Sequence, residues 1–483
     1  MNRIGSLFLF KPSKLLKRCS FARNNTSAFS THQENEKEAG TLIFRILANG
    51  DSTVTVKKIQ DGIKNSGILW KDPRLVNFRD RITTLLNKNE KEYDATDINL
   101  NDFLHILDDD DNKTLELMCK VFSKSCAIPN FQNFIKVIEK LYLKAANNMD
   151  GKVADYIPQL AKADPNLWGV SVCTIDGQRY SFGDTDQPFC LQSCVKPIAY
   201  AVAVSDYHAS TIHQYMGEEP SGLYFNALHL NTEDKPHNPL INAGSIVICS
   251  LIKPELPLAD RFHYVLDNIT ELCGREQVGF DNTVFLSEKE TSYRNFAIAY
   301  YLMEKDCFPP NTQLEPTLDF YLQLCAITAT CESASVAAAT FANGGVSPLF
   351  EHQKRLLGPV AVRNTLSLMH SCGMYDYSGK FAFHVGLPAK SGVAGGLFVV
   401  VPNVMGIMCR SPLLDEKGNS VRGIQFCEEL VKHFNFHIYD DLHHSIKKSN
   451  PRNLQRELTD LELSLRKVGR RLFNYASDED DLD

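Results

Sequence analysis

The sequence predicts a mixed α/β fold in which one antiparallel sheet is covered by helices and faces a helical lobe. Two pairs of strand-like segments, near 168–182 and 396–409, lie at the two ends of the central part of the chain, and helical patterns fill the space between them. Because these helices must cover the sheet and also pack on one another, we expect a cleft between the sheet and the helical lobe.

Length and charge limit the possible architectures and ligands. A chain of 483 residues is too long for one ordinary core. The net charge of -7 argues against nucleic acid as the main ligand. The best apolar stretch is interrupted by Pro402 and Asn403, so no membrane span is expected. Four segments are predicted: a presequence with a linker at 1–40, a helical N-terminal domain at 41–148, a catalytic domain at 149–439, and a helical tail with an acidic end at 440–483.

The first 30 residues have the composition of a mitochondrial transit peptide. They contain arginine, lysine, serine, leucine and phenylalanine, with no acidic residue before Glu34. The apolar segment Leu7–Phe10 is too short for the core of a secretory signal. A mitochondrial location on the matrix side is therefore expected, and a disordered basic arm is the alternative.

Strand and helix signals follow in order along the chain. The segment 168–175 alternates in the manner of a strand, Asp176-Gly177 forms a hairpin turn, and 178–182 returns. A second pair is expected at 396–401 and 404–409, joined through Pro402-Asn403. Helices are predicted at 131–143, 196–205, 242–252, 294–303, 332–341 and 360–371.

The last helical pattern is a short heptad seam. Leucine and valine recur in steps of four and three from Leu454 to Leu472. Because the seam covers only about two and a half heptads, docking on the protein's own body and a coiled coil both remain open.

The segment Gln192-Ser193-Cys194-Val195-Lys196-Pro197 has the spacing of a serine nucleophile and its base. Proline is tolerated only in the first turn of a helix, so Pro197 places a helix start close to Ser193. Side chains at i and i+3 share a helix face, which brings the Lys196 amine within reach of the Ser193 hydroxyl. Burial would lower the pKa of the lysine and allow it to act as a base. The tetrapeptide alone is also compatible with an ordinary surface helix.

Other residues add to this motif. Lys390-Ser391-Gly392 precedes a predicted strand, in the manner of the triplet that borders the active site of serine β-lactamases. Tyr375 lies in a glycine-bounded loop, where it would either reach a cleft or cap the core. The 14 cysteines form no zinc pattern, so no metal is expected, and Cys194 is interpreted as a packing residue rather than the nucleophile.

Several long segments together resemble the metazoan kidney-type glutaminases, which are mitochondrial enzymes that hydrolyse glutamine to glutamate and ammonia. The resemblance is weak from Thr41 and strong from Gly151 to Tyr439. It implies a β-lactamase-like catalytic domain in which glutamine is the substrate and no cofactor is needed. The matching segments are Ala154–Leu160, Pro188–Pro197, Asp234–Pro239, Arg294–Ile298, Asn364–Tyr375 and His384–Gly396.

The resemblance also implies roles for individual residues. Ser193 would attack the side-chain amide, Lys196 would activate it, and Tyr375 would relay a proton to ammonia. Tyr156 would lie close to the same network, and the backbone N–H groups of Ser193 and Val393 would form the oxyanion hole. The residues implied to bind substrate are Gln192, Ser193, Asn242, Glu288, Asn295, Tyr321, Tyr375 and Val393.

Elementary chemistry agrees with this binding set. Glutamine presents an ammonium and a carboxylate, so a selective site needs one acid and several neutral donors. Glu288 can supply the acid, and the asparagine and tyrosine side chains can supply the donors. Judged locally, however, Glu288 would be a solvated surface acid, the asparagines would be helix caps and Tyr321 would be a core residue.

The family pattern further implies a homotetramer built as a dimer of dimers, possible filaments, and activation by inorganic phosphate. Tyr224, Ala227 and His229 replace an arginine, a lysine and a phenylalanine of that pattern, which weakens the attraction for anions there. The residues implied for the regulatory loop are Leu223, Phe225, Leu228, His229, Leu230 and Tyr301.

Two other functions compete with glutamine hydrolysis. A penicillin-recognising or esterase-like acyl transferase would share the serine and lysine, but it would lack the set formed by Glu288, Asn295 and Tyr321. A catalytically inactive scaffold would assemble through its helical regions, although every proposed catalytic position holds a competent residue.

Overall fold

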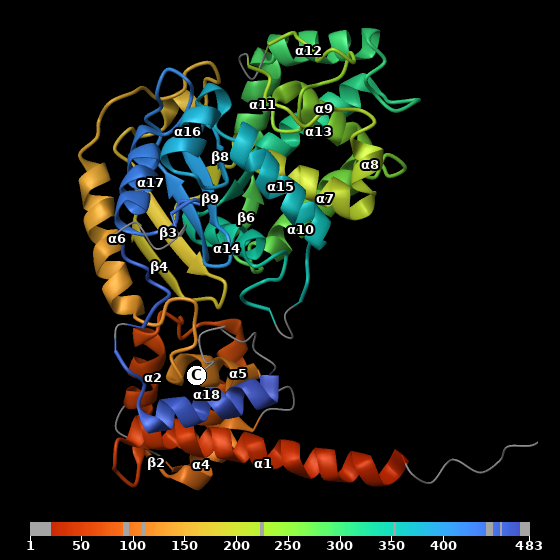
Figure 1. Cartoon of the computed structure of the whole chain (residues 1–483). Helices are drawn as coiled ribbons and strands as arrows, with labels where there is room; N and C mark the ends of the chain where they lie inside the picture. Colours follow the sequence, from red (N-terminus) through yellow and green to blue (C-terminus); the bar gives the residue numbers. More distant parts are fainter. Residues whose placement is uncertain are drawn as a thin grey trace, which may run out of the picture.

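The computed structural model describes residues 21–89, 96–108, 113–222, 227–350, 354–440, 448–454 and 456–473. Figure 1 shows a sheet covered by helices, a helical lobe beside it and a smaller helical unit below. None of the helices in these ranges is long and apolar enough to cross a membrane. The helices are α1 (Phe21–Ala48), α2 (Val56–Asn65), α3 (Val76–Asn89), α4 (Leu100–Leu107), α5 (Lys113–Phe122), α6 (Phe131–Ala146), α7 (Lys196–Asp206), α8 (Ala209–Ile212), α9 (Asn242–Leu251), α10 (Leu258–Leu272), α11 (Asn282–Thr291), α12 (Tyr293–Glu304), α13 (Leu314–Cys325), α14 (Cys331–Ala342), α15 (Pro359–Cys372), α16 (Ser378–His384), α17 (Val421–His433) and α18 (Asp460–Phe473), with short 3-10 turns including η3 (Gln192–Val195) and η5 (Tyr375–Tyr377).

The main sheet has five antiparallel strands in the order β4-β3-β10-β9-β8. Both predicted hairpins are confirmed, and they meet because β3 pairs with β10 from Gly169 opposite Arg410 to Thr174 opposite Met405. A smaller antiparallel sheet has the order β5-β7-β6, and a two-residue pair joins β1 to β2. The strands are β1 (Val54–Thr55), β2 (Asp97–Ile98), β3 (Gly169–Thr174), β4 (Arg179–Gly183), β5 (Phe189–Cys190), β6 (Val278–Phe280), β7 (Ile327–Ala329), β8 (Ala389–Ser391), β9 (Gly396–Val401) and β10 (Met405–Arg410).

Helices cover both faces of the main sheet. In β9, Leu397 and Val399 belong to an apolar cluster with α6 and α17, whereas Phe398 and Val400 belong to the cluster that contains α14. This division follows from the two-residue period of a strand, and it explains why all six residues of β9 are buried. At Gly406 a Cβ atom would lie 2.1 Å from the backbone nitrogen of Ala339, so α14 can cross the sheet only over a glycine.

The helical lobe contains α7, α9, α10, α12, α13 and α15, which share one apolar cluster with α14. Helix α7 packs against α9 and α15, and α9 packs against α12 and α13 (Figure 1). Five predicted helices are present, and their limits lie within two residues of those expected. They are α7, α9, α12, α14 and α15. Because α7 is buried along nearly its whole length, the segment that follows Ser193 is rigidly held.

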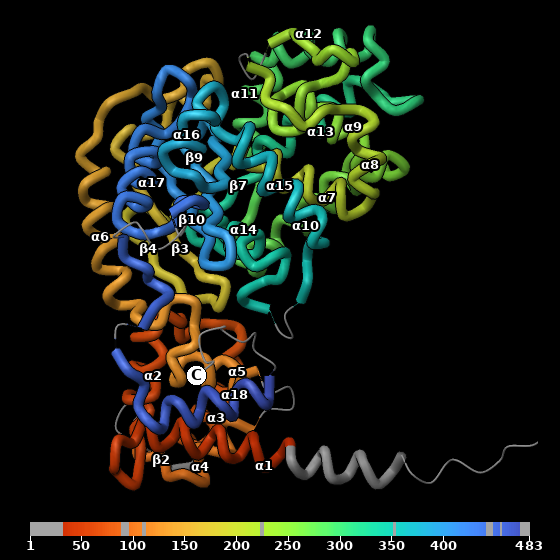
Figure 2. Tube along the Cα trace, viewed as in Figure 1, coloured from red at the N-terminus to blue at the C-terminus, as the bar shows by residue number. Residues whose placement is uncertain are grey.

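The smaller helical unit is closed by segments from both parts of the chain. An apolar cluster contains residues of α1 to α5 together with Leu465 and Val468 of α18, and the chain trace in Figure 2 shows α18 lying alongside α1. Ala39 of α1 is fully buried in this cluster, so folded structure begins before the expected boundary at residue 41. Helix α6, placed in the N-terminal domain by the sequence, packs instead in the cluster under the main sheet.

The C-terminal heptad pattern forms only part of a helix, which docks on the protein itself. Helix α18 begins at Asp460, because the Thr459 hydroxyl accepts from the Glu462 N–H while the Glu462 carboxylate accepts from the Thr459 N–H. Leu454 and Leu458 precede this cap and therefore lie outside the helix. The acidic segment 478–483 lies outside the described residues.

Shortening a buried residue of α18 tests this packing. Leu465→Ala should destabilise the smaller helical unit by about 2–5 kcal/mol, because Leu465 is 0% exposed and its removal leaves a cavity. Hydrogen exchange of α1 and α5 would measure the loss. Leu463→Ala is the matched control, since Leu463 is 41% exposed on the same helix. Equal protection in the two variants would contradict the packing role of α18.

Candidate active site

Ser193 lies in the short turn η3 between β5 and α7. Pro197 occupies the first turn of α7, as the sequence predicts, so the helix begins at Lys196. The preceding residue, Gln192, has φ of 49°, a conformation that is unusual outside glycine and is typical of functional turns. All four residues of the turn are buried, and Ser193, at 8%, is the most exposed of them.

Lys196 is buried beneath this turn. Its ammonium donates a hydrogen bond to Asn242 Oδ1 at 2.6 Å, and it lies 5.8 Å from the centre of the Tyr321 ring. Burial lowers the pKa of Lys196 to about 8. The sequence predicts that this amine reaches the Ser193 hydroxyl; the hydrogen bond that the structure gives Lys196 is to Asn242.

A tyrosine and a second lysine also lie near Ser193. Burial raises the pKa of Tyr375, and the side chain of Ser193 interacts with the tyrosine hydroxyl and opposes that rise. Tyr375 donates to the Ser391 carbonyl oxygen at 3.0 Å, and so does the Lys390 ammonium at 2.8 Å. Burial and the nearby charge of Lys196 lower the pKa of Lys390 to about 7. Tyr375 has φ of 51°, so it and the residue before Ser193 are both held in the left-handed region.

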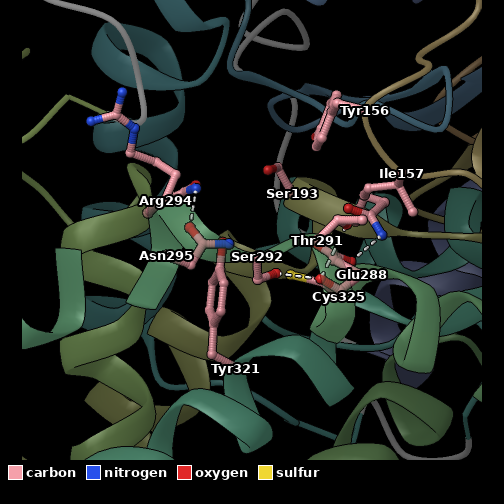
Figure 3. A pocket seen from close by; sticks show the side chains of 12 residues that line it. Tyr156, Ile157, Ser193, Glu288, Thr291, Ser292, Arg294, Asn295, Tyr321 and Cys325 are labelled. Carbon is pink, nitrogen blue, oxygen red and sulfur yellow. Dashed lines mark hydrogen bonds between the residues drawn. The ribbon is translucent and has the colours of Figure 1, made fainter. Parts of the chain in front are cut away.

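A cavity of about 330 Å³ opens beside Ser193 (Figure 3). Its walls come from η3, the loop before β3, and helices α9, α11, α12 and α13. None of the residues lining this cavity belongs to the five-stranded sheet, whose strand β8 reaches the site through the Ser391 carbonyl oxygen that accepts from Tyr375. The lining residues are Tyr156, Ile157, Gln192, Ser193, Asn242, Glu288, Thr291, Ser292, Arg294, Asn295, Tyr321 and Cys325.

Glu288 is buried rather than solvated. It is 6% exposed and accepts a hydrogen bond from Gln192 Nε2 at 2.9 Å. Burial raises the pKa of this carboxyl to about 7. On another part of the wall, Asn242 Nδ2 donates to Asn295 Oδ1 at 2.9 Å. The cavity therefore presents one acid and separate amide groups, which is the arrangement that an amino acid requires.

Seven of the residues predicted for the site line this cavity, and three do not. The three that do not line it are Lys196, Tyr375 and Val393. Each contacts a residue that does: Lys196 is hydrogen-bonded to Asn242, and Tyr375 interacts with Ser193. Val393 belongs to the same apolar cluster as Ile157. Tyr156 lines the cavity but is 54% exposed, so it lies near the opening.

None of the described residues predicted for the regulatory loop is among those that line the cavity. Leu223 and Phe225 lie outside the described residues. Leu228 is 44% exposed, Leu230 is buried, and Tyr301 packs on the helical lobe. His229 contributes Nδ1 to a hydrogen bond of 3.2 Å with His237 Nε2.

Five lining residues were not predicted from the sequence. Helical spacing could have found most of them, since residues three or four apart share a face. Thr291 and Ser292 follow Glu288 by three and four positions, and Cys325 follows Tyr321 by four. The complete set is Ile157, Thr291, Ser292, Arg294 and Cys325.

The fold and this site define a class of protein. The structure combines a helix-covered antiparallel sheet, a serine at the start of a buried helix and two buried lysines near that serine, which are the features of hydrolases with the serine β-lactamase-like fold. Within that class, the family model described as Glutaminase matches residues 151–439. The chain belongs to the glutaminase family, and it hydrolyses glutamine to glutamate.

Relatives extend this similarity beyond the matched region. The mitochondrial liver isoform of glutaminase from Mus musculus is 47% identical over 88% of this chain and 69% of its own length. Putative glutaminase 2 from Caenorhabditis elegans is 44% identical over 89% and 72%. A solved structure described as the probable glutaminase ybaS is 37% identical with a TM-score of 0.59, covering 63% of this chain and 97% of that chain.

Proposed function

We propose that this glutaminase works through a glutamyl ester on Ser193. The Ser193 oxygen bonds to the side-chain carbonyl carbon of glutamine, the carbon–nitrogen bond breaks, and ammonia leaves with a proton. Water then cleaves the ester to release glutamate. The observation that supports this is the position of Ser193, which lies at the cavity wall and interacts with a half-buried tyrosine that shares a carbonyl acceptor with a second buried lysine.

Lys196 is the proposed base. With a pKa of about 8, roughly one amine in ten is neutral at pH 7 and can accept the Ser193 proton. Tyr375 is proposed to relay the proton to the departing ammonia, because its hydroxyl interacts with the side chain of Ser193. The backbone N–H groups of Ser193 and Val393 are proposed to hold the oxyanion. The reaction needs no metal or organic cofactor.

Substrate binding is proposed to use the charges of the cavity wall. Ionised Glu288 would accept the α-ammonium group, while Asn242, Asn295 and Tyr321 would donate to the α-carboxylate. Gln192 would keep Glu288 oriented through the hydrogen bond at 2.9 Å.

Removing the charge of Glu288 should mainly weaken substrate binding. We expect Glu288→Gln to raise the KM for glutamine by roughly ten- to a hundredfold, because a buried ionic contact is lost while the side chain keeps its shape. Steady-state kinetics separate this effect from a loss of kcat. Glu290→Gln, which changes a nearby acid on the same helix that does not line the cavity, is the control. An unchanged KM would remove Glu288 from the binding site.

Ammonia release from glutamine by the purified chain tests the proposed function directly. Turnover of glutamine without turnover of esters or β-lactams is expected, because the cavity combines an acid with amide groups suited to a free amino acid. Turnover of penicillins or simple esters in place of glutamine would favour the acyl-transferase alternative, and no turnover of any of them would favour the scaffold.

The finer identity of the enzyme is also a proposal. The sequence segments quoted above favour a kidney-type enzyme, and the names of the mouse and rat relatives, both liver isoforms termed mitochondrial, support a mitochondrial location. We place it on the matrix side, after removal of a presequence that ends upstream of the buried Ala39. Homotetramers, filaments and phosphate activation are proposed from the family pattern, with weaker phosphate dependence because Tyr224 and Ala227 carry no charge.

A further inference from the structure

The cavity contains one charged group that the proposed mechanism does not use. Among its lining residues, all of them in the described part of the chain, Arg294 is the only cation. It is the second residue of α12 and precedes Asn295, which contributes to the wall. In Figure 3 its guanidinium extends away from the other labelled side chains, whereas Glu288 lies on the opposite side of the cavity.

The guanidinium of Arg294 is available to a ligand. Arg294 is exposed, and within the residues that the structure describes it makes no hydrogen bond or ion pair. Other cations behave differently: Lys289 of α11 pairs with Asp319 at 2.7 Å, and Arg275, away from the cavity, pairs with Glu271 at 2.7 Å. A guanidinium presents a fork of N–H donors that matches the oxygens of a carboxylate or a phosphate.

The helix start adds to this positive potential. The hydroxyl of Ser292, the residue before α12, makes no cap to the helix and instead donates to the carbonyl oxygen of Glu288. The first N–H groups of α12 therefore contribute positive charge on the same side of the cavity as Arg294.

We propose that Arg294 is an oxyanion-binding residue at the cavity opening, which recognises a carboxylate of the amino acid or an inorganic phosphate. This inference rests on the proposed function, because the reaction changes the net charge of the bound amino acid. Glutamine has no net charge, whereas glutamate carries one negative charge. Arg294 therefore favours the product over the substrate and sets the strength of product inhibition.

Calorimetric titrations in a Ser193→Ala background test this role, since that variant binds both amino acids without turnover. Arg294→Gln should raise the Kd of glutamate about two- to fivefold at low ionic strength, as expected for an exposed ion pair, and raise that of glutamine less. Arg294→Lys, which keeps the charge, should restore most of the affinity. Added salt should remove the difference in glutamate Kd between the protein that keeps Arg294 and the Arg294→Gln variant.

Two further arms complete the experiment. Arg275→Gln, which removes an exposed and paired arginine elsewhere, should leave both Kd values unchanged. If inorganic phosphate weakens glutamate binding only when Arg294 is present, both anions share the site; if phosphate has no effect, the site takes the carboxylate alone. An equal Kd for glutamate in the Arg294 and Arg294→Gln proteins at low salt would overturn the proposal. A failure of the Ser193 mechanism would appear in turnover and would leave these titrations intact.

Discussion

Replacing Ser193 with alanine should lower the kcat of glutamine hydrolysis by roughly four to six orders of magnitude. The expected loss is this large because removing a nucleophile eliminates the covalent route as a whole, and the remaining groups act only together with it. Glutamine should still bind with a Kd close to the wild-type value, because Glu288, Asn242 and Asn295 line the cavity independently of the hydroxyl. Ammonia release measures the rate, and calorimetry measures the binding.

Ser292→Ala provides the matched control for this variant. Ser292 lines the same cavity, but its hydroxyl donates to a backbone carbonyl oxygen rather than facing Tyr375. Its replacement should therefore keep activity within about tenfold of the wild type. A Ser193→Ala enzyme that retained more than a few per cent of wild-type activity would contradict the ester mechanism.

Lys196→Ala is expected to lose roughly three to five orders of magnitude in kcat/KM. The amine is the proposed acceptor of the Ser193 proton, and its loss also leaves Asn242 Oδ1 without its buried donor. In the wild type, kcat/KM should rise with pH up to about 8 and then level off, because only the neutral amine is a base and its pKa is about 8. This rise should disappear from the residual activity of the variant.

Two comparisons make the role of Lys196 specific. Lys432→Ala, which removes an exposed lysine paired with Glu429, should leave the rate and the pH profile unchanged. Lys390→Ala should reduce activity while keeping the rise near pH 8, because that rise belongs to Lys196. If the rise survived in Lys196→Ala and vanished in Lys390→Ala, the second lysine would be the base.

Local pattern was sufficient to predict the parts of the fold that depend on short-range physics. Alternation and the Asp176-Gly177 turn located the β3–β4 hairpin, and Pro197 located the start of α7. The sequence does not report which distant segments pack against one another. The apolar face of α6 suits either the N-terminal helices or the sheet, and only the folded chain shows that it contacts the sheet. The start of α18 likewise depended on a capping contact within 459–462.

The candidate site shows the same division. The spacing of Ser193 and Lys196 predicts a reactive pair, but their partners Tyr375 and Asn242 come from other elements. Glu288, judged locally, is a surface acid; its burial depends on the packing of α11 against α13, which no local pattern reports. Arg294 begins one of the segments that carry the family resemblance, but nothing in the sequence gave it a role, because an exposed arginine becomes notable only when a cavity is seen beside it.

The position of α18 has a consequence for how the protein is made. The ribosome delivers α1 to α5 first and α18 much later, yet both contribute to a single apolar cluster. The early helices must therefore remain incompletely covered during most of synthesis, while the intervening catalytic region can already assemble. The N-terminal unit is thus completed only after α18 has emerged, and chaperones that shield exposed apolar surface would be needed longest by the part of the chain that emerges first.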